Sequence, residues 1–570
     1  MPRIVKRARE DEINSSTVNE EIQEDPLITI RKRAIRQNPT LTANAKESLK
    51  IAVLRDTDKI SFSSSSSSSS SSLISDTSWW SPVFTHQLFP LEKVFGYKNP
   101  LVRIIYSDPD LRISVQGNAE SVKAEVTIPN PSMNGKLVRV SADNLHTCLE
   151  KALPPAFPAY LVDAHIANHS GSPPLRKPMF FPEEALPLHK QSSSSTTSSS
   201  TSLSAVWKPF GKCISTFQVP SKTGNTLRTF SIYRWKIAES VETQAYHERA
   251  STLAVHLIET ASAIDVTDQR WTCFGLYEEL SSSSYSFAGY ATVFRFVSPL
   301  RKLPKGGDGI RRVECVRLSQ LIVLPPFQRL GLGMKLLSAI QNLADEVNAY
   351  EITIESPCEE MATLRDAFDI RRAFAFATGI ENSTKLFGSF SIPNHWKLNV
   401  QDSEVFLKHL EEKQETSGEW VDEESIESLR STLRITLQQA RRCFEALCLS
   451  RIDFFGDRSS SKNISSNKGS ASSTSHIQIQ RSYRLLQKKR FYLKGADVRA
   501  LPNVEDRKEV LEDRYRLLES SYLGALAPLL DPVSQLPIVN RQDVLASQTT
   551  WLQRRSAIEA ENEKDDEEEE

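Results

Sequence analysis

Two glycines, Gly331 and Gly333, lie where an apolar stretch passes into a helical pattern, and residues of this type at this spacing can hold a phosphate. Residues 318–324 are rich in apolar and β-branched side chains and end at Pro325, which predicts a buried strand. Apolar residues at three- and four-residue spacing in 336–340 predict a helix whose first turn contains the glycines. The free amides of that turn attract an anion, and glycine lets a pyrophosphate approach because it has no Cβ.

The residues around these glycines do not fit two common phosphate motifs. A P-loop needs Gly-Lys-Ser/Thr, but Gly333 is followed by Met334, Lys335 and Leu336. A dinucleotide fingerprint needs a third glycine or an alanine where Leu336 stands. The remaining pattern is Gln328-Arg-Leu-Gly-Leu-Gly333. A glycine-rich turn between a strand and a helix also arises simply for packing, and that alternative stays open.

A carboxylate at the end of a second strand is a candidate proton acceptor. In Glu351-Ile-Thr-Ile-Glu355 the isoleucines alternate to one face, so Glu355 lies on the other face, and Pro357 ends the strand. A lysine amine, with a pKa of about 10.4, needs a base before it can attack an acyl group at neutral pH. A partly shielded glutamate at a strand end can act as that base, although an isolated glutamate there is more often only solvated.

Glu259 is a second candidate carboxylate. Leu253, Leu257, Ile258 and Ala261 predict a helical stripe that leaves Glu259 on the opposite face, where a surface glutamate would be unremarkable.

The pattern of Gln328 to Gly333 between a strand and a helix resembles the acetyl-CoA pyrophosphate loop of the GNAT N-acetyltransferase superfamily. Further blocks occur in order around it and make the resemblance more specific. Together they resemble the catalytic subunits of type B histone acetyltransferases, from about residue 79 to about residue 527. The blocks are Trp80-SPVFTHQL-Phe89, Phe95-Gly-Tyr97, Lys208-Pro-Phe-Gly211, Tyr246-His-Glu-Arg249, Ile258-ETASAI-Asp265, Asp268-Gln-Arg-Trp271 and Ile352-Thr-Ile-Glu355.

The resemblance implies acetyl-CoA as co-substrate, and no metal. It implies that backbone groups of one strand pair with the pantetheine arm, as a strand edge accepts an extended peptide, and that the glycine loop takes the pyrophosphate. A cysteine directly after the second strand contacts CoA in similar proteins. The cofactor-binding residues implied in this way are Leu321, Ile322, Val323, Gln328, Arg329, Leu330, Gly331, Leu332, Gly333, Met334 and Cys358.

The resemblance also implies catalytic roles for both glutamates. Glu355 corresponds to the general base in a Glu-Asp-Pro motif, but this chain has Ser356 where the family has aspartate, so any help from that aspartate is lost. Glu259 corresponds to an active-site carboxylate in the family's I-E-T-A-S block. Phe294, Arg295 and Phe296 match a block that lines the histone-tail groove in relatives, where the residues are mostly Tyr and Asn; strand packing is the alternative for both phenylalanines.

Composition favours an intracellular protein. The chain has 570 residues, enough for three or four domains, and its seven cysteines form no Cys-x-x-Cys pair or zinc spacing. No apolar run approaches the roughly 20 residues of a transmembrane helix, and the polar N-terminus does not resemble a signal peptide. The formal charge of −1 hides basic clusters near residues 6–9 and 31–36 and an acidic end at 565–570. We interpret both ends as solvated tails. Alternatively, the basic clusters are a nuclear import signal and the acidic end attracts basic histones.

We predict an α+β fold, with a GNAT core whose mixed sheet is flanked by helices, an N-terminal α+β domain and a C-terminal helical domain. Serine-rich runs near 63–72, 191–204 and 458–476 are interpreted as linkers or inserts. A basic stretch at 481–493 is interpreted as a solvated helix face rather than a nucleic-acid site. The predicted boundaries are a disordered head at 1–78, the N-terminal domain at 79–230, the core at 231–398, the helical domain at 399–530 and a tail at 531–570.

The expected function is that of a type B histone acetyltransferase catalytic subunit, which moves acetyl from acetyl-CoA to tail lysines of newly made, free histone four. The resemblance implies a WD-repeat histone-binding partner, histone three in the same complex, cytoplasmic and nuclear residence, and no direct contact with nucleic acid or membrane. Two alternatives remain: a histone chaperone scaffold that binds acetyl-CoA but turns over poorly because of Ser356, and an acetyltransferase for another amine.

Overall fold

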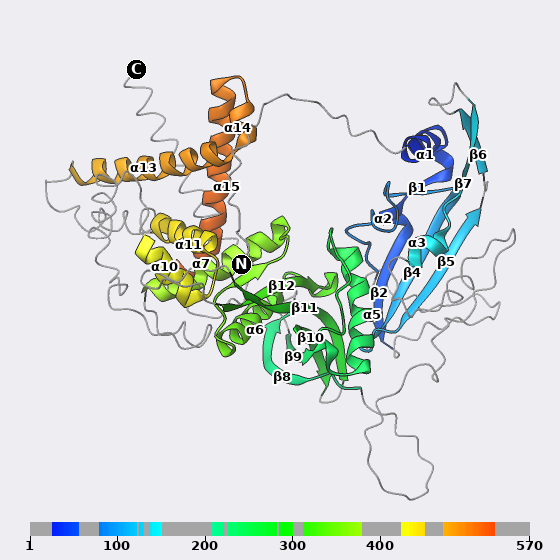
Figure 1. Cartoon of the computed structure of the whole chain (residues 1–570), viewed down its shortest axis with the longest axis horizontal. Helices are drawn as coiled ribbons and strands as arrows, with labels where there is room; N and C mark the ends of the chain where they lie inside the picture. Colours follow the sequence, from blue (N-terminus) through cyan, green and yellow to red (C-terminus); the bar gives the residue numbers. More distant parts are fainter. Residues whose placement is uncertain are drawn as a thin grey trace, which may run out of the picture.

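The computed structural model describes residues 26–55, 79–121, 125–129, 136–150, 207–221, 226–281, 284–299, 312–378, 423–450 and 471–530. The predicted inserts near 63–72 and 191–204, most of the insert near 458–476 and the acidic end lie outside these residues; residues 471–476 are helical. Figure 1 shows strands of the N-terminal region on one side of a central sheet and a group of helices on the other.

The N-terminal region contains three small sheets. β2 runs parallel to β4, β5 is antiparallel to β4, and β1–β3 and β6–β7 form two-stranded pairs. Alternating apolar residues such as Ile51 and Ile104 are buried between these strands and the helices. The elements are α1 (Pro26–Gln37), η1 (Pro39–Leu41), β1 (Thr42–Asn44), α2 (Ala45–Ser48), β2 (Leu49–Arg55), β3 (Lys93–Phe95), β4 (Tyr97–Asp108), β5 (Ile113–Ser121), β6 (Glu125–Pro129), β7 (Leu137–Ser141) and α3 (Leu145–Glu150).

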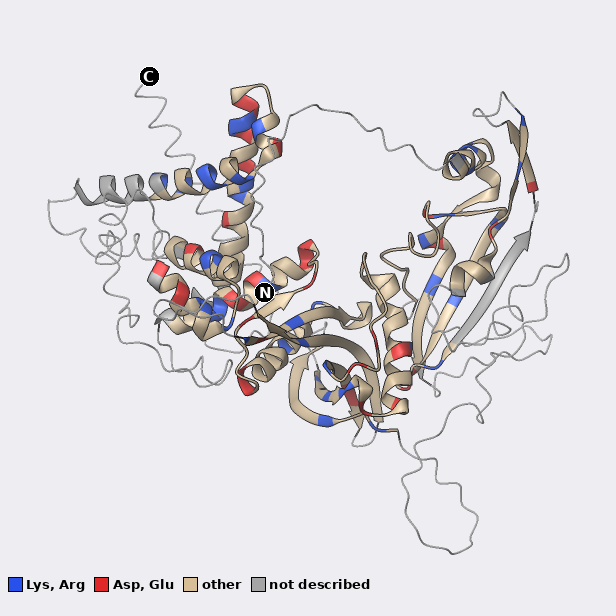
Figure 2. Ribbon diagram, in the orientation of Figure 1, with Lys and Arg blue, Asp and Glu red and all other residues tan. Residues whose placement is uncertain are grey.

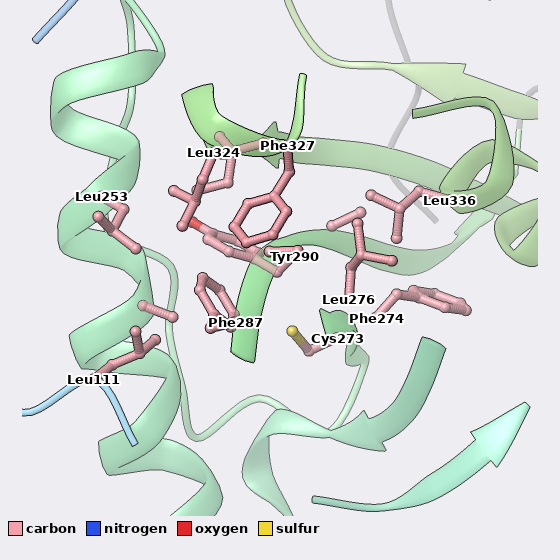
Figure 3. Packing of buried hydrophobic residues seen from close by; sticks show 14 of the residues in the cluster. Leu111, Leu253, Cys273, Phe274, Leu276, Phe287, Tyr290, Leu324, Phe327 and Leu336 are labelled. Carbon is pink, nitrogen blue, oxygen red and sulfur yellow. The ribbon is translucent and has the colours of Figure 1, made fainter. Parts of the chain in front are cut away.

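The central sheet has six strands in the order β13-β12-β11-β10-β9-β8, all antiparallel except for the parallel pair β12–β13. Side chains of α5 and α6 pack with its strands: in Figure 3, Leu253 of α5 and Leu336 of α6 lie on either side of Phe287 and Tyr290. This mixed sheet with helices confirms the predicted fold class. The elements are β8 (Lys212–Pro220), β9 (Leu227–Lys236), η5 (Ile237–Glu239), α5 (Val241–Leu257), β10 (Trp271–Ser281), β11 (Ser284–Ser298), β12 (Val313–Val323), η6 (Pro325–Phe327), α6 (Leu332–Glu346) and β13 (Ile352–Ile354).

The described C-terminal residues are helical, as predicted. A second apolar core joins them to α7 through residues such as Phe374, Phe444 and Tyr522. In the ribbon of Figure 2, several Lys and Arg positions, coloured blue, lie along α13. Arg484 and Lys488 pair with Glu512 of α15, which fits a salt-bridged helix face. The helices are α7 (Glu359–Thr378), α10 (Glu423–Leu433), α11 (Leu437–Ser450), α13 (Ala471–Lys494), α14 (Ala496–Ala500) and α15 (Val504–Leu530).

The structure corrects two predicted boundaries. Residues 26–55 do not belong to a disordered head, because β2 pairs along its length with β4 and Leu49 and Ile51 are buried. The boundary at 230 is also wrong, since β8 and β9 are strands of the central sheet. The boundary at 398 lies outside the described residues. In the described part of the chain, no helix is long and apolar enough to cross a membrane.

Candidate active site

Strands β12 and β13 pair over only part of β12. Val316, Arg317 and Leu318 lie opposite Ile352, Thr353 and Ile354, and the backbone N–H of Glu355 donates to the Leu318 carbonyl at 2.9 Å. β13 then ends, whereas β12 continues to Val323. From residue 319 onward the described residues therefore provide no strand partner for β12 on the β13 side.

A β-bulge at Ser319 changes the direction of the backbone at this point. On β11, Val293 faces Leu318 and Thr292 faces Gln320, so Ser319 is the extra residue. Further along, the N–H of Leu324 donates to the carbonyl of Ala288, which lies just before Gly289 on β11. By alternation, the polar groups of Ile322 also face β11, and those of Leu321 and Val323 face the unpaired edge.

Ser319 holds the candidate base. Its Oγ donates to Oε2 of Glu355 at 2.7 Å, and the Glu355 side chain is exposed directly after β13. The next residue, Gln320, is buried; it accepts a hydrogen bond from Tyr290 Oη and donates one to the Ser262 carbonyl at 3.0 Å. We did not predict a role for Ser319. Ser319-Gln320 interrupts the apolar run at 318–324, but this pattern alone does not reveal a partner for Glu355.

The two glycines of the loop serve different purposes. Gly331 caps α6 with a φ of 76°, and a Cβ there would meet nothing within 4 Å, so the space above the turn is open. A Cβ on Gly333 would lie 2.9 Å from a Leu364 methyl group, so a larger residue here would require the Leu364 side chain on α7 to shift. The packing alternative therefore applies to Gly333. Gln328 donates from Nε2 to the Val323 carbonyl at 2.9 Å and ties the loop to the end of β12.

The start of α7 lies beside this loop. Cys358 is exposed, and its carbonyl accepts the N–H of Ala362 at 2.9 Å. Hydrogen bonds from its own backbone N–H and from the Cys358 thiol lower the pKa of Glu360, and the charge of Arg329 acts in the same direction. Arg329 is close enough for this effect, which places Cys358 next to the predicted pyrophosphate loop.

Glu259 does not lie on a helix face as predicted. α5 ends at Leu257, and Ile258 has an extended backbone, so the exposed Glu259 occupies the turn that follows. Ile258 still packs on the core, which explains why its spacing imitated a helical stripe. The Glu259 carbonyl accepts from Gln87 Nε2 at 3.0 Å, and the same loop reaches β12 through the bond from Gln320 to Ser262.

Comparison with known proteins identifies relatives of the chain. Residues 41–259 match the family model described as "Histone acetyl transferase HAT1 N-terminus". The "Histone acetyltransferase type B catalytic subunit" of Rattus norvegicus is 35% identical over 167 residues, covering 28% of this chain and 37% of that protein. The protein of the same name from Neurospora crassa is 25% identical over 486 residues, covering 78% of this chain and 82% of its own. Over these spans the chain is similar to the type B histone acetyltransferase catalytic subunits.

The Rattus norvegicus match spans about a third of that relative's length. Among solved structures, an aminoglycoside acetyltransferase from a soil metagenomic sample covers 29% of this chain and 93% of its own, at 14% identity and a TM-score of 0.17. That score is too low to support any argument about the whole chain.

Ser356 stands where the resemblance described above implies an aspartate. Its φ is 38°, in the left-handed region. Aspartate and asparagine are enriched among the non-glycine residues that adopt positive φ. An aspartate would therefore suit the backbone at this position better than the serine of this chain does.

The predicted histone-contacting residues of β11 are half-buried, and the two phenylalanines form cation–π contacts. Phe294 packs on Trp271, with ring centroids 4.8 Å apart, and lies beneath the Arg270 guanidinium. Phe296 lies beneath Arg317, which is 4.7 Å from its ring centroid. Strand packing thus accounts for both phenylalanines. Arg295 alternates to the opposite face and pairs with Glu314.

Proposed function

We propose that the chain is a histone lysine acetyltransferase, with acetyl-CoA as co-substrate and Glu355 as general base. The observation that carries the proposal is the unpaired edge of β12, which runs between the glycine turn of α6 and the Glu355 carboxylate. The names of its relatives supply the reaction class. Among the described residues, no cluster of His, Cys, Asp or Glu is arranged to hold a metal, and the proposed mechanism requires none.

The residues present fit acetyl-CoA. When bound, acetyl-CoA supplies the activated acetyl group. Open space above Gly331 and the free amides at the start of α6 suit its pyrophosphate, since these N–H groups have no partner inside the helix. Leu321 and Val323 direct backbone groups to the unpaired edge. The groups of Leu321 and the N–H of Val323 would hold the amide groups of the pantetheine arm, whereas the Val323 carbonyl already accepts from Gln328 and the groups of Ile322 are used by β11. Cys358 would lie near the same arm.

Glu355 would take the proton of the attacking amine. Ser319 occupies Oε2 of the carboxylate, which leaves Oε1 to accept that proton directly or through a water molecule. Thr353 and Arg317 lie across from each other in β13 and β12, so a substrate on this face would approach beside the Phe296–Arg317 contact. This geometry does not involve a covalent intermediate on Cys358.

The finer assignments are also proposals. Free histone four as the substrate, a WD-repeat histone-binding subunit as the partner with histone three in the complex, and residence in both cytoplasm and nucleus come from the resemblance to the type B family. Glu259 is retained as a second carboxylate that would meet the basic histone tail, because its exposed turn is attached to β12.

The test is CoA release by the purified chain with acetyl-CoA and a histone-four tail peptide. Glu355→Gln should lower turnover by about a hundredfold or more, the usual contribution of a general base. Unchanged turnover in the variant would move the role to Glu259 or to water. If the wild type binds acetyl-CoA and the peptide but does not turn over, the scaffold alternative replaces the enzyme.

A further inference from the structure

The outer edge of β13 is held by helices rather than by another strand. The N–H of Ile352 donates to the Arg434 carbonyl at 2.7 Å, and its carbonyl accepts from Arg365 Nη2 at 3.1 Å. Ile352 and Ile435 form an isolated parallel bridge. Arg365 belongs to α7, and Arg434 and Ile435 form the turn between α10 and α11. Both outward-facing backbone groups of Ile352, the first residue of β13, are thus bound by the helical region.

The Arg434 side chain fixes this turn to the segment that leads into β13. It donates to Asp345 Oδ1 at 2.7 Å, to Asn348 Oδ1 at 2.9 Å and to the Ala349 carbonyl. These acceptors lie at the end of α6 and in the turn after it. The φ of Arg434 is 53°, so the backbone here is left-handed. One guanidinium therefore connects the helical turn to α6 and to the start of the strand that carries Glu355.

The turn cannot move independently of α7. Leu429 and Leu433 of α10 are fully buried in the same apolar core as Ile370 of α7. Asp366 of α7, itself buried, accepts from Gln439 Nε2 at 2.9 Å and pairs with Arg442, both on α11. The hairpin and α7 thus form one support for β13.

We propose that the α10–α11 turn, acting through Arg434, is a positioning element for Glu355. This inference rests on the proposed role of Glu355 as base. β13 is only three residues long, so its bonds to β12 fix one edge alone. Misplacement of a reacting group by about 1 Å can cost a hundredfold in rate. Loss of the outer support should therefore reduce turnover while leaving acetyl-CoA binding intact, because the glycine loop lies at the opposite end of α6.

The experiment is Arg434→Gly in the full chain. Glycine accepts the left-handed backbone, so the side-chain contacts are removed with little strain. We expect kcat with a histone-four tail peptide to fall roughly tenfold to a hundredfold, while the KM for acetyl-CoA and the affinity for CoA stay within about twofold of wild type. Arg434→Lys keeps a cation opposite Asp345 but loses the fork of donors, and should give an intermediate kcat. The matched control is Arg441→Ala, which breaks the exposed pair with Glu423 in the same hairpin and should leave kcat unchanged.

A double variant separates positioning from general support. If Arg434 acts through Glu355, then Arg434→Gly should cause no further loss in the Glu355→Gln background, since coupled residues are not additive. Multiplicative losses, or wild-type kcat in Arg434→Gly, would overturn the proposal. If Arg434→Gly does not fold, Arg365→Lys replaces it, and unchanged kcat in that variant would equally overturn it. Full activity in Glu355→Gln would instead refute the proposed base, a result that does not depend on the Arg434 variants.

Discussion

The Glu355 carboxylate accepts a hydrogen bond from the Ser319 hydroxyl of the neighbouring strand. Only one of these two residues could be predicted from the sequence. The sequence placed Glu355 correctly at a strand end, because alternating isoleucines and a following proline mark a strand by themselves. It did not reveal Ser319 as the partner, since a bulge depends on the register with β11 and not on local residues. Glu259 was misplaced because an apolar side chain just beyond a helix can continue the helical spacing.

Removing the Ser319 hydroxyl should make the carboxylate less well oriented. Ser319→Ala is expected to lower kcat roughly fivefold to tenfold, since a typical hydrogen bond contributes about 1 kcal/mol. Ser319→Thr keeps the donor and tolerates a strand, and should retain most of the activity. Steady-state kinetics with acetyl-CoA and the tail peptide measure both. Equal rates for Ala and Thr variants would show that the hydroxyl has no orienting role.

At the scale of elements, strands and helices could be predicted where apolar residues recur with a clear periodicity. The strand before the glycines, the helix after them and the short strand ending at Glu355 are observed as β12, α6 and β13. The unpaired edge of β12 was expected only from the resemblance, because strand separation depends on where β13 stops. α5 carries a feature that the sequence did not reveal: His247 and His256 are fully buried, and none of their ring nitrogens has a hydrogen-bond partner.

These two histidines should make stability pH-dependent. Burial lowers the pKa of each from 6.5 to about 4, because the interior disfavours the charged ring. Between these values the unfolded chain binds more protons than the folded chain, so the free energy of unfolding should fall as pH decreases from about 6.5 towards 4. Each histidine contributes about 1.4 kcal/mol per pH unit within that window.

Denaturant titrations at several pH values measure this dependence. His247→Phe keeps an aromatic ring against Tyr290, whose ring centroid lies 5.7 Å from that of His247. The variant should lose less stability than wild type on acidification from pH 7 to pH 5. If the free energy of unfolding depends on pH equally in wild type and variant, His247 is not protonated on unfolding in this window.

At the scale of the whole molecule, low-complexity composition was a poor guide to boundaries. The serine run at 63–72 led us to assign everything before it to a disordered head, although Leu49-Lys-Ile-Ala-Val-Leu54 has the content of a strand. The boundary at 230, which assigned β8 to the N-terminal domain and divided β9, failed for a different reason. The local sequence of a strand does not tell which of two adjoining sheets it completes.

The N-terminal strands and the central sheet should unfold together, because one apolar core spans both. Tyr106 of β4 and Thr252 of α5 share a buried hydrogen bond of 2.8 Å, and Thr252 also donates to the Arg249 carbonyl. Tyr106→Phe removes only the shared bond, so we expect a loss of about 1 kcal/mol in a single cooperative transition. Thermal unfolding followed by near- and far-ultraviolet circular dichroism tests this. Two separated transitions would show that the regions fold independently.

The unpaired edge of β12 also has a consequence for self-association. An exposed strand edge usually invites pairing with a strand from another molecule. Beyond Ser319, Leu321 and Val323 turn backbone groups to the unpaired edge of β12. This open edge is bounded by β13 at one end and by the glycine loop at the other. Two outward-facing residues can bind a narrow ligand such as the pantetheine arm, but they are too few to pair with a strand from another molecule. The short length of the opening thus limits edge-to-edge pairing at β12.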